Sequence, residues 1–166
     1  MTETPRLNTA RALLEQVPDP EIPALSVVEM GMIAGIWVEK GIAQVDLLPT
    51  YSGCPAVTAI ADEIVRTLRR GGFRDVRVQV KSSPAWSTDF LCDAARRKLR
   101  ESGIAPPTEP ETGAEEGPFA ERRLAPDCPY CDSAETVTVS EFGSTACKSL
   151  HHCEACRQPF EHFKRF

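Results

Sequence analysis

Four of the seven cysteines stand in two C-x-x-C pairs, Cys128 with Cys131 and Cys153 with Cys156. This spacing lets both thiolates of a pair face one ion, and four thiolates suit a tetrahedral metal. The 21 residues between the pairs slightly exceed the usual spacing of about 15 to 20 residues. A predicted strand over residues 136–142 and a turn at Gly143-Ser144 absorb that excess. The pattern predicts one metal bound by these four cysteines.

Zinc is the favoured metal for this set, although four thiolates would also hold a single iron. A closed four-sulfur site leaves no position open for water or substrate, so the ion is expected to be structural. His151 and His152 precede the second pair, but the four sulfurs complete the site, and both imidazoles are expected on the surface. Cys147 has no partner at metal spacing and is expected to be a buried small side chain.

The cysteine-rich tail from Cys128 to Phe166 is short for an independent domain. A segment below about 40 residues rarely buries enough apolar area to fold without a disulfide or a metal. The tail is therefore predicted to be an antiparallel β zinc ribbon that depends on its ion.

Cys54 is a second candidate site, in the segment Thr50-Tyr51-Ser52-Gly53-Cys54-Pro55. It follows a predicted strand and precedes a helix expected to open at Pro55, where free N–H groups and the helix dipole would lower its pKa. Such a thiol could act as a nucleophile or as a metal ligand. A lone cysteine cannot enclose a cluster, so the other ligands would come from a second copy, a partner protein or a small thiol. The alternative is a cysteine tolerated in a tight turn.

The elements before the tail alternate between helix and strand. Apolar spacing predicts a first helix ending before Pro18, and strands at 36–38 and 42–48 form a hairpin. A helix from Pro55 to Gly71, a strand over 76–80 and a helix from near Ser87 to Gly103 follow. The order helix-strand-strand-helix-strand-helix predicts an α+β fold with one layer of helices on one mixed sheet.

Composition divides the chain into two parts. Residues 104–125 contain four prolines and five acidic residues and few large apolar side chains, which is typical of an extended linker. We therefore expect a first domain at 1–103, a linker at 104–125 and the ribbon at 126–166.

The overall composition restricts the class of protein. Hydrophobic residues make up 42% of the 166 residues, and no apolar run reaches the roughly 18 residues of a membrane helix. A formal net charge of -5 gives no reason to expect nucleic-acid binding. The N-terminus has no secretory pattern, so a cytoplasmic protein is expected, and its cysteines are better explained as metal ligands or reactive thiols than as disulfides.

Four segments of the first part form a recognisable set: Asp19-Pro20-Glu21-Ile22-Pro23, the run from Leu25 to Ile33, the Gly-Cys-Pro of the Thr50–Pro55 loop, and Pro84-Ala85-Trp86 leading into Asp89. With these segments, about residues 7–103 resemble the SufT-like, MIP-type domain of iron-sulfur assembly factors. It implies that Cys54 is the ligand of a transient iron-sulfur cluster. It supplies no counterpart for Cys92, which is expected in the core.

Three further residues of these segments could be functional or structural. Asp19 and Glu21 could form a catalytic carboxylate pair, but acids beside prolines more often satisfy backbone donors in a rigid loop. Trp86 could gate a ligand pocket, although an aromatic residue ahead of a helix usually anchors packing.

The combination of this domain with a four-cysteine ribbon containing the segment from Glu141 to Lys148 is similar to the D subunit family, also called J, of bacterial phenylacetyl-CoA epoxidases. The resemblance implies an accessory factor of aerobic phenylacetate degradation that assembles or delivers the cluster of the reductase component. It implies no catalytic site of its own, and the chain lacks a dinucleotide glycine loop and paired Glu-x-x-His motifs. A homodimer is possible. The alternatives are a structural adaptor subunit and an electron-transfer protein whose ribbon holds iron.

Overall fold

The computed structural model describes residues 3–108 and 125–166. The chain divides into two compact units, of which the first comprises Met1–Lys98 together with Phe166 and the second comprises Leu99–Arg165. Each unit has its own sheet.

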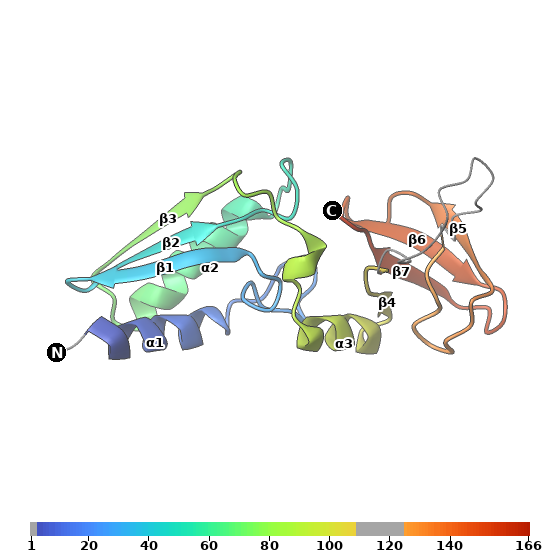
Figure 1. Ribbon diagram of the computed structural model, residues 1–166, viewed down its shortest axis with the longest axis horizontal. Helices are drawn as coiled ribbons and strands as arrows, with labels where there is room; N and C mark the ends of the chain where they lie inside the picture. Colours follow the sequence, from blue (N-terminus) through green and yellow to red (C-terminus); the bar gives the residue numbers. More distant parts are fainter. Residues whose placement is uncertain (1–2, 109–124) are drawn as a thin grey trace. The chain divides into compact units, whose positions relative to one another are not determined.

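The first unit contains the predicted order of elements (Figure 1). The elements are α1 (Glu3–Leu14), β1 (Ile33–Glu39), β2 (Ile42–Leu47), α2 (Val57–Arg70), β3 (Asp75–Val80), a 3-10 turn (Thr88–Phe90) and α3 (Asp93–Glu101), which continues past the unit boundary. The strands form a sheet in the order β1-β2-β3, in which β1 and β2 are antiparallel and β2 and β3 are parallel. The expected α+β fold with a mixed sheet is confirmed.

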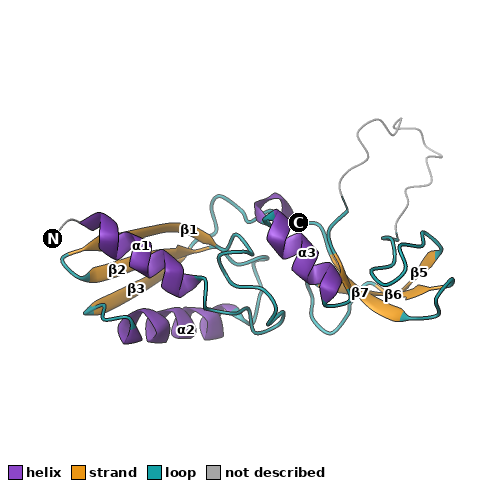
Figure 2. Ribbon diagram, turned by 90° about the horizontal axis from the view of Figure 1, so that it is seen from below, coloured by secondary structure: helices purple, strands orange, loops and turns teal. Residues whose placement is uncertain are grey.

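Helices α1 and α2 pack against each other and against one face of this sheet (Figure 2). Helix α2 buries Ile60, Ile64 and Leu68, which recur at helical spacing, and the central strand buries Ala43 and Val45. One apolar stripe of the helix is buried against one face of the sheet. The apolar periodicity of the sequence therefore predicted a layer of helices on a sheet.

Two helix starts differ from the sequence prediction. Helix α2 begins at Val57 rather than at Pro55, because the chain first makes a turn in which the Cys54 N–H donates to the Tyr51 carbonyl. The third helix begins at Asp93 rather than near Ser87. Ser87 caps only the short 3-10 turn, and Leu91 then adopts an extended conformation that interrupts the helix.

The segment between α1 and β1 has no regular structure but is tightly bonded. Asp19 is buried, and its Oδ1 accepts hydrogen bonds from the N–H groups of Glu21 and Ile22, both at 2.8 Å. Trp86 is also buried and donates from Nε1 to the Met30 carbonyl at 2.9 Å. The structural roles expected for Asp19 and Trp86 are thus confirmed.

The second unit is a four-stranded sheet in the order β4-β7-β6-β5. Strands β5 (Thr136–Ser140), β6 (Lys148–Cys153) and β7 (Pro159–Phe163) are antiparallel, as expected for a ribbon. Strand β4 (Ile104–Ala105) adds to β7 in parallel, so two residues assigned to the linker belong to this sheet. Most of the predicted linker, residues 109–124, lies outside the described residues, and the boundaries at 103 and 125 stay a prediction.

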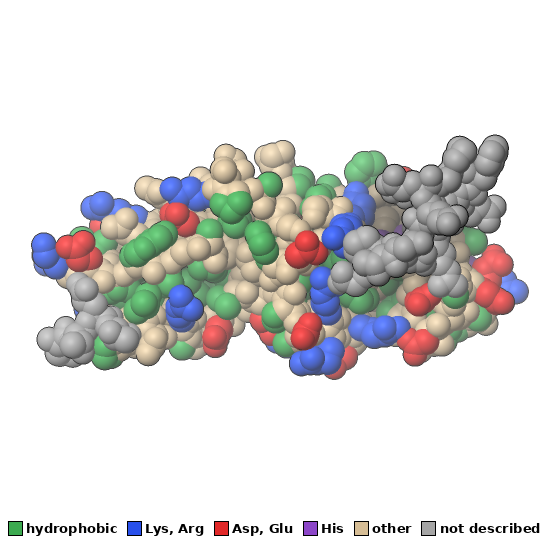
Figure 3. Space-filling model, viewed as in Figure 1, with side chains coloured by type: hydrophobic (Ala, Val, Ile, Leu, Met, Phe, Trp, Pro, Cys, Tyr) green, Lys and Arg blue, Asp and Glu red, His purple; other side chains and the backbone are tan. Residues whose placement is uncertain are grey.

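The expectations about charge and membrane helices can be compared with the surface and the helices of the structure. On the face drawn in Figure 3, Lys and Arg side chains are interspersed with Asp and Glu side chains over both units. Within the residues that the structure describes, no helix is both long enough and apolar enough to cross a membrane.

Candidate metal centre and thiol loop

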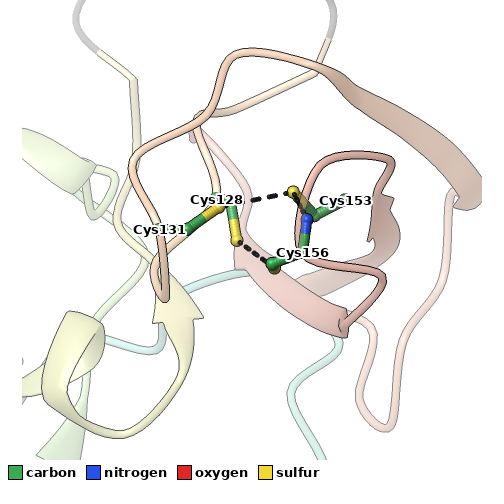
Figure 4. Close-up of side chains that lie close together, drawn as sticks. All are labelled: Cys128, Cys131, Cys153 and Cys156. Atoms are coloured by element: carbon green, nitrogen blue, oxygen red, sulfur yellow. Dashed lines mark hydrogen bonds between the residues drawn. The ribbon is translucent and has the colours of Figure 1, made fainter.

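The four cysteines of the two C-x-x-C pairs converge on one point in the second unit (Figure 4). Their Sγ atoms all lie within 4.8 Å of one another. The sulfurs of Cys128 and Cys156 are 3.7 Å apart and those of Cys131 and Cys153 are 3.6 Å apart, so each close contact joins one turn to the other. Sequence spacing had predicted this grouping.

The two turns have the same backbone geometry. In each, the first cysteine accepts a hydrogen bond at its carbonyl from the residue four positions later, Asp132 at 3.0 Å and Arg157 at 3.0 Å. Both of these residues have a positive φ, of 59° and 63°. The N–H of the first cysteine donates to the residue five positions later, Ser133 at 2.9 Å and Gln158 at 3.0 Å. The ribbon therefore presents two matching knuckles to one ion.

In the second turn the backbone also stabilises negative charge on one sulfur, whereas burial raises the pKa of Cys128 in the first turn. The Cys156 N–H donates to the Cys153 sulfur at 3.5 Å, and this backbone contact contributes most to lowering the pKa of Cys153 to about 7. A thiolate is the form that binds a metal. Cys128 and Cys153 are buried together with Ala105 and Phe160, so the centre is also the core of this small unit.

The arrangement fits a four-sulfur metal. With Zn–S bonds of about 2.3 Å, tetrahedral geometry puts neighbouring sulfurs about 3.8 Å apart, close to the separations of the Cys128–Cys156 and Cys131–Cys153 pairs. A single tetrahedral iron would need a similar arrangement, so the sulfur positions support a metal without separating zinc from iron.

Other residues of the ribbon partly follow expectation. Cys147 is buried, as predicted, and lies 3.1 Å from the Thr145 hydroxyl. The prediction that His151 lies on the surface is wrong: its side chain is buried and stacks on Phe160 at 5.5 Å. The reason is register, because His151 lies on β6 opposite Phe160 of β7 and therefore faces the core.

Cys54 lies in the first unit, half-buried in the loop between β2 and α2. Its electrostatic neighbours are the carboxylates of Glu21 and Asp19, and the Thr50 hydroxyl and the Ala56 N–H hydrogen-bond to its sulfur. Two segments that are far apart in the sequence, Asp19–Ile22 and Thr50–Pro55, therefore both influence the charge of this thiol.

The expectation that Cys54 has a depressed pKa is wrong. Burial raises the pKa of this thiol, the charges of Glu21 and Asp19 raise it further, and the bond from Ala56 offsets only part of the rise. The helix expected to stabilise a thiolate begins at Val57, three residues after Cys54, rather than at Pro55. The sequence alone could not show that Asp19 and Glu21 act on Cys54, although both acids lie in a motif on which the resemblance rests.

Cys92 corrects a second expectation, because it is exposed rather than in the core. It lies just before α3, and its sulfur accepts a hydrogen bond from the Ala95 N–H at 3.4 Å. Cys92 therefore occupies the N-cap position of this helix.

Comparisons with known proteins match both parts of the chain. Residues 8–80 match the family described as iron-sulfur cluster assembly protein, and residues 113–164 match the family described as PaaD zinc beta ribbon domain. An Escherichia coli protein, provisionally named as the D subunit of 1,2-phenylacetyl-CoA epoxidase, is 41% identical over 162 residues, covering 96% of this chain and 93% of that protein. The chain belongs to this family of phenylacetyl-CoA epoxidase D subunits.

Part of this chain is also similar to other proteins. The Bacillus subtilis Fe-S protein maturation auxiliary factor YitW is 31% identical over 88 residues, covering 52% of this chain and 85% of that protein. The crystal structure of a domain of unknown function from Bacillus anthracis covers 58% of this chain and 93% of its own, with a TM-score of 0.56 and 24% identity. A conserved hypothetical protein from Thermotoga maritima has a TM-score of 0.50 and 22% identity, covering 60% of this chain and 98% of its own. These two structures support the fold alone.

Proposed function

We propose that this chain is an accessory factor that delivers an iron-sulfur unit to the reductase component of phenylacetyl-CoA epoxidase, with Cys54 as the ligand of the cargo. The observation that carries the proposal is the position of Cys54, half-buried beside Asp19 and Glu21 within the part that matches the iron-sulfur assembly family. The name of the E. coli relative is the reason for proposing the epoxidase system. The family resemblance of the sequence is the reason for proposing the reductase as the recipient.

The surroundings of Cys54 suit reversible binding better than permanent binding. Loading exchanges the S–H bond of Cys54 for an S–Fe bond and releases one proton, and transfer to a recipient returns the proton to sulfur. Because the carboxylates of Asp19 and Glu21 raise the pKa of the thiol, they favour the protonated, empty form once the cargo has left. The same negative charges attract a cationic iron centre while it is bound.

One thiol does not complete the coordination of a cluster. The remaining ligands would come from a second copy of this chain, a small thiol or the cysteines of the recipient. An open ligand set of this kind allows the recipient to replace the donor one bond at a time.

The ribbon is proposed to hold one structural zinc through Cys128, Cys131, Cys153 and Cys156. The carrying observation is the sulfur arrangement at the centre of the unit's core. A closed four-thiolate site stabilises the fold and offers no substrate position, so no catalytic role is assigned to it.

The same sulfur distances leave electron transfer as a second candidate, with iron in the ribbon. Elemental analysis of protein purified without added metal separates the two. One zinc per chain and a colourless protein are expected, whereas one iron with visible sulfur-to-iron absorption would assign the ribbon to electron transfer.

A reconstituted transfer tests delivery. The full chain is loaded anaerobically with ferrous iron and sulfide, freed of excess reagents, and mixed with reductase from which the cluster has been removed. The expected result is that the native protein and Cys92→Ala restore the visible absorption of the reductase, whereas Cys54→Ala does not. Cys92 is the matched control because it is the other thiol that is neither in the four-cysteine group nor buried. Equal transfer by Cys54→Ala would favour a structural adaptor.

A further inference from the structure

A polar pocket of about 130 Å³ lies in the second unit, away from the four sulfurs. Its wall includes two hydroxyls, Thr138 and Ser149, and two imidazoles, His151 and His162, from strands β5, β6 and β7. These four side chains belong neither to the four-cysteine metal centre nor to the Cys54 loop, and no function has been assigned to them so far.

His162 has an unsatisfied ring nitrogen. Its side chain is 9% exposed, and its Nε2 has no hydrogen-bond partner among the residues that the structure describes. A buried polar atom without a partner is rare in folded proteins, because its lost bonds to water are not replaced. Since His162 lines the pocket, a molecule bound there can supply the missing partner.

The other nitrogen of His162 belongs to a chain of polar contacts. Ser149 Oγ lies 3.4 Å from His162 Nδ1 and 2.8 Å from His151 Nε2, and Thr138 Oγ1 lies 3.4 Å from His151 Nδ1. Burial, with a smaller contribution from His151, lowers the pKa of His162 to about 4, so the ring is neutral near pH 7. When Ser149 donates its hydroxyl proton to Nδ1, Nε2 carries the remaining ring proton and is a hydrogen-bond donor.

Two cations and one acid also line the pocket. The Lys164 ammonium lines the pocket and is held by a bond to the Glu141 carbonyl at 3.2 Å and by the Phe142 ring at 4.5 Å. An ammonium has three protons, so the Glu141 bond leaves donors for a ligand. Arg165 adds a second cation to the wall, against the single carboxylate of Glu141.

We propose that this pocket binds a small oxyanion, a carboxylate or a phosphate group. His162 Nε2–H and the Lys164 ammonium donate to its oxygens, and the Thr138 hydroxyl contributes where the ligand reaches it. The volume exceeds the roughly 10 to 15 Å³ that a single water needs, so the pocket has room for such a group. The inference depends neither on delivery by Cys54 nor on the identity of the metal.

Titration of the zinc-loaded full chain, labelled with nitrogen-15, tests the site. Sodium phosphate and sodium acetate are added separately near pH 7, with chloride holding the ionic strength constant, and the histidine ring resonances are followed. We expect saturable shifts of the His162 resonances with at least one of the two anions, and a move of its ring proton toward Nε2. Phosphate alone would indicate a phosphate site, and acetate alone a carboxylate site.

Three variants separate this site from general anion attraction. Lys164→Met keeps the stem and removes the ammonium, and His162→Phe keeps the ring and removes both nitrogens. Each should weaken binding at least tenfold, whereas Lys40→Met, which removes the same charge from the exposed hairpin turn, should leave it unchanged. Should His162→Phe lose its fold, Lys164→Met still decides.

Non-saturating shifts with both anions, equal to those with chloride, would overturn the proposal. Equal weakening by Lys40→Met and Lys164→Met would also overturn it.

Discussion

Opposing influences act on the Cys54 thiol. Burial and the carboxylates of Glu21 and Asp19 raise its pKa, while the Ala56 N–H and the Thr50 hydroxyl lower it, and the net direction is upward. A reactive cysteine usually has a lowered pKa, and this one does not. For a carrier the difference is useful, because an iron centre can displace the proton whereas solvent oxidants find little thiolate at neutral pH.

Alkylation rates against pH measure this effect. In a zinc-loaded Cys92→Ser background, which removes the other exposed thiol outside the four-cysteine group, the Cys54 rate should have its midpoint above the free-cysteine value of about 8.5. Glu21→Gln should move the midpoint down because it removes a neighbouring negative charge. Glu15→Gln, on an exposed residue just after α1, is the control and should leave it unchanged. A midpoint below about 8, or no response to Glu21→Gln, would refute the assigned surroundings.

Each C-x-x-C turn ends on a residue with an unusual backbone conformation, which is Arg157 in the second turn. Arg157 has a φ of 63°, in the left-handed region that glycine adopts most readily. Arg157→Gly should therefore keep or raise the thermal midpoint of the zinc-loaded ribbon, whereas Arg157→Val should lower its stability by about 1 to 2 kcal/mol. Circular dichroism of the full chain, with zinc content measured in parallel, tests this order. A valine variant as stable as the native chain would contradict the backbone account.

Helix α3 is tied to the loop before β1 through Glu29. The Glu29 carboxylate accepts from Lys98 Nζ at 2.7 Å and from the Ser26 N–H at 3.0 Å, and Ser26 Oγ accepts from the Glu29 N–H at 3.2 Å. Burial alone would raise the pKa of Glu29, but the bonds from Lys98 and Ser26 outweigh it, and the net pKa is lowered.

A lowered carboxyl pKa fixes the sign of the pH dependence. The stabilisation is fully present above the unfolded value of about 4.3 and is lost as pH falls through the folded pKa. Glu29→Gln should flatten this loss, and because Lys98 is partly exposed the change should be about 1 kcal/mol or less. Urea unfolding between pH 3 and 6 can be followed by tryptophan fluorescence, since Trp37 and Trp86 both lie in the first unit. An unchanged pH profile in Glu29→Gln would show that another group is responsible.

At the scale of the whole molecule, the sequence predicted what depends on spacing and periodicity. The two C-x-x-C pairs predicted the four-sulfur group, and the apolar stripe of α2 predicted its layer. The alternation on β3 was only partly correct, because Val76 is buried but Val80 is exposed. Features that depend on tertiary contacts were missed. The acids beside Cys54 come from a distant loop, and the burial of His151 follows from its register with Phe160.

The His162 pocket was missed for the same reason. Its two hydroxyls and two imidazoles come from three strands, of which β7 was not predicted, and neither residue type nor spacing marks them as a group. The start of α3 was displaced by the extended Leu91, a local conformation that an apolar pattern does not reveal.

Delivery of the cargo by Cys54 is tested most directly by the metal content of the reductase. In cells whose only copy of this chain carries Cys54→Ala, the isolated reductase should be deficient in iron and sulfide while retaining its flavin, and phenylacetate-dependent growth should fail. Cells with Cys92→Ala serve as the control and should yield a fully loaded reductase. The Cys54→Ala chain should remain folded with its zinc, since the four ribbon cysteines lie in the other unit. A full complement of iron and sulfide in the reductase from Cys54→Ala cells would contradict delivery through this thiol.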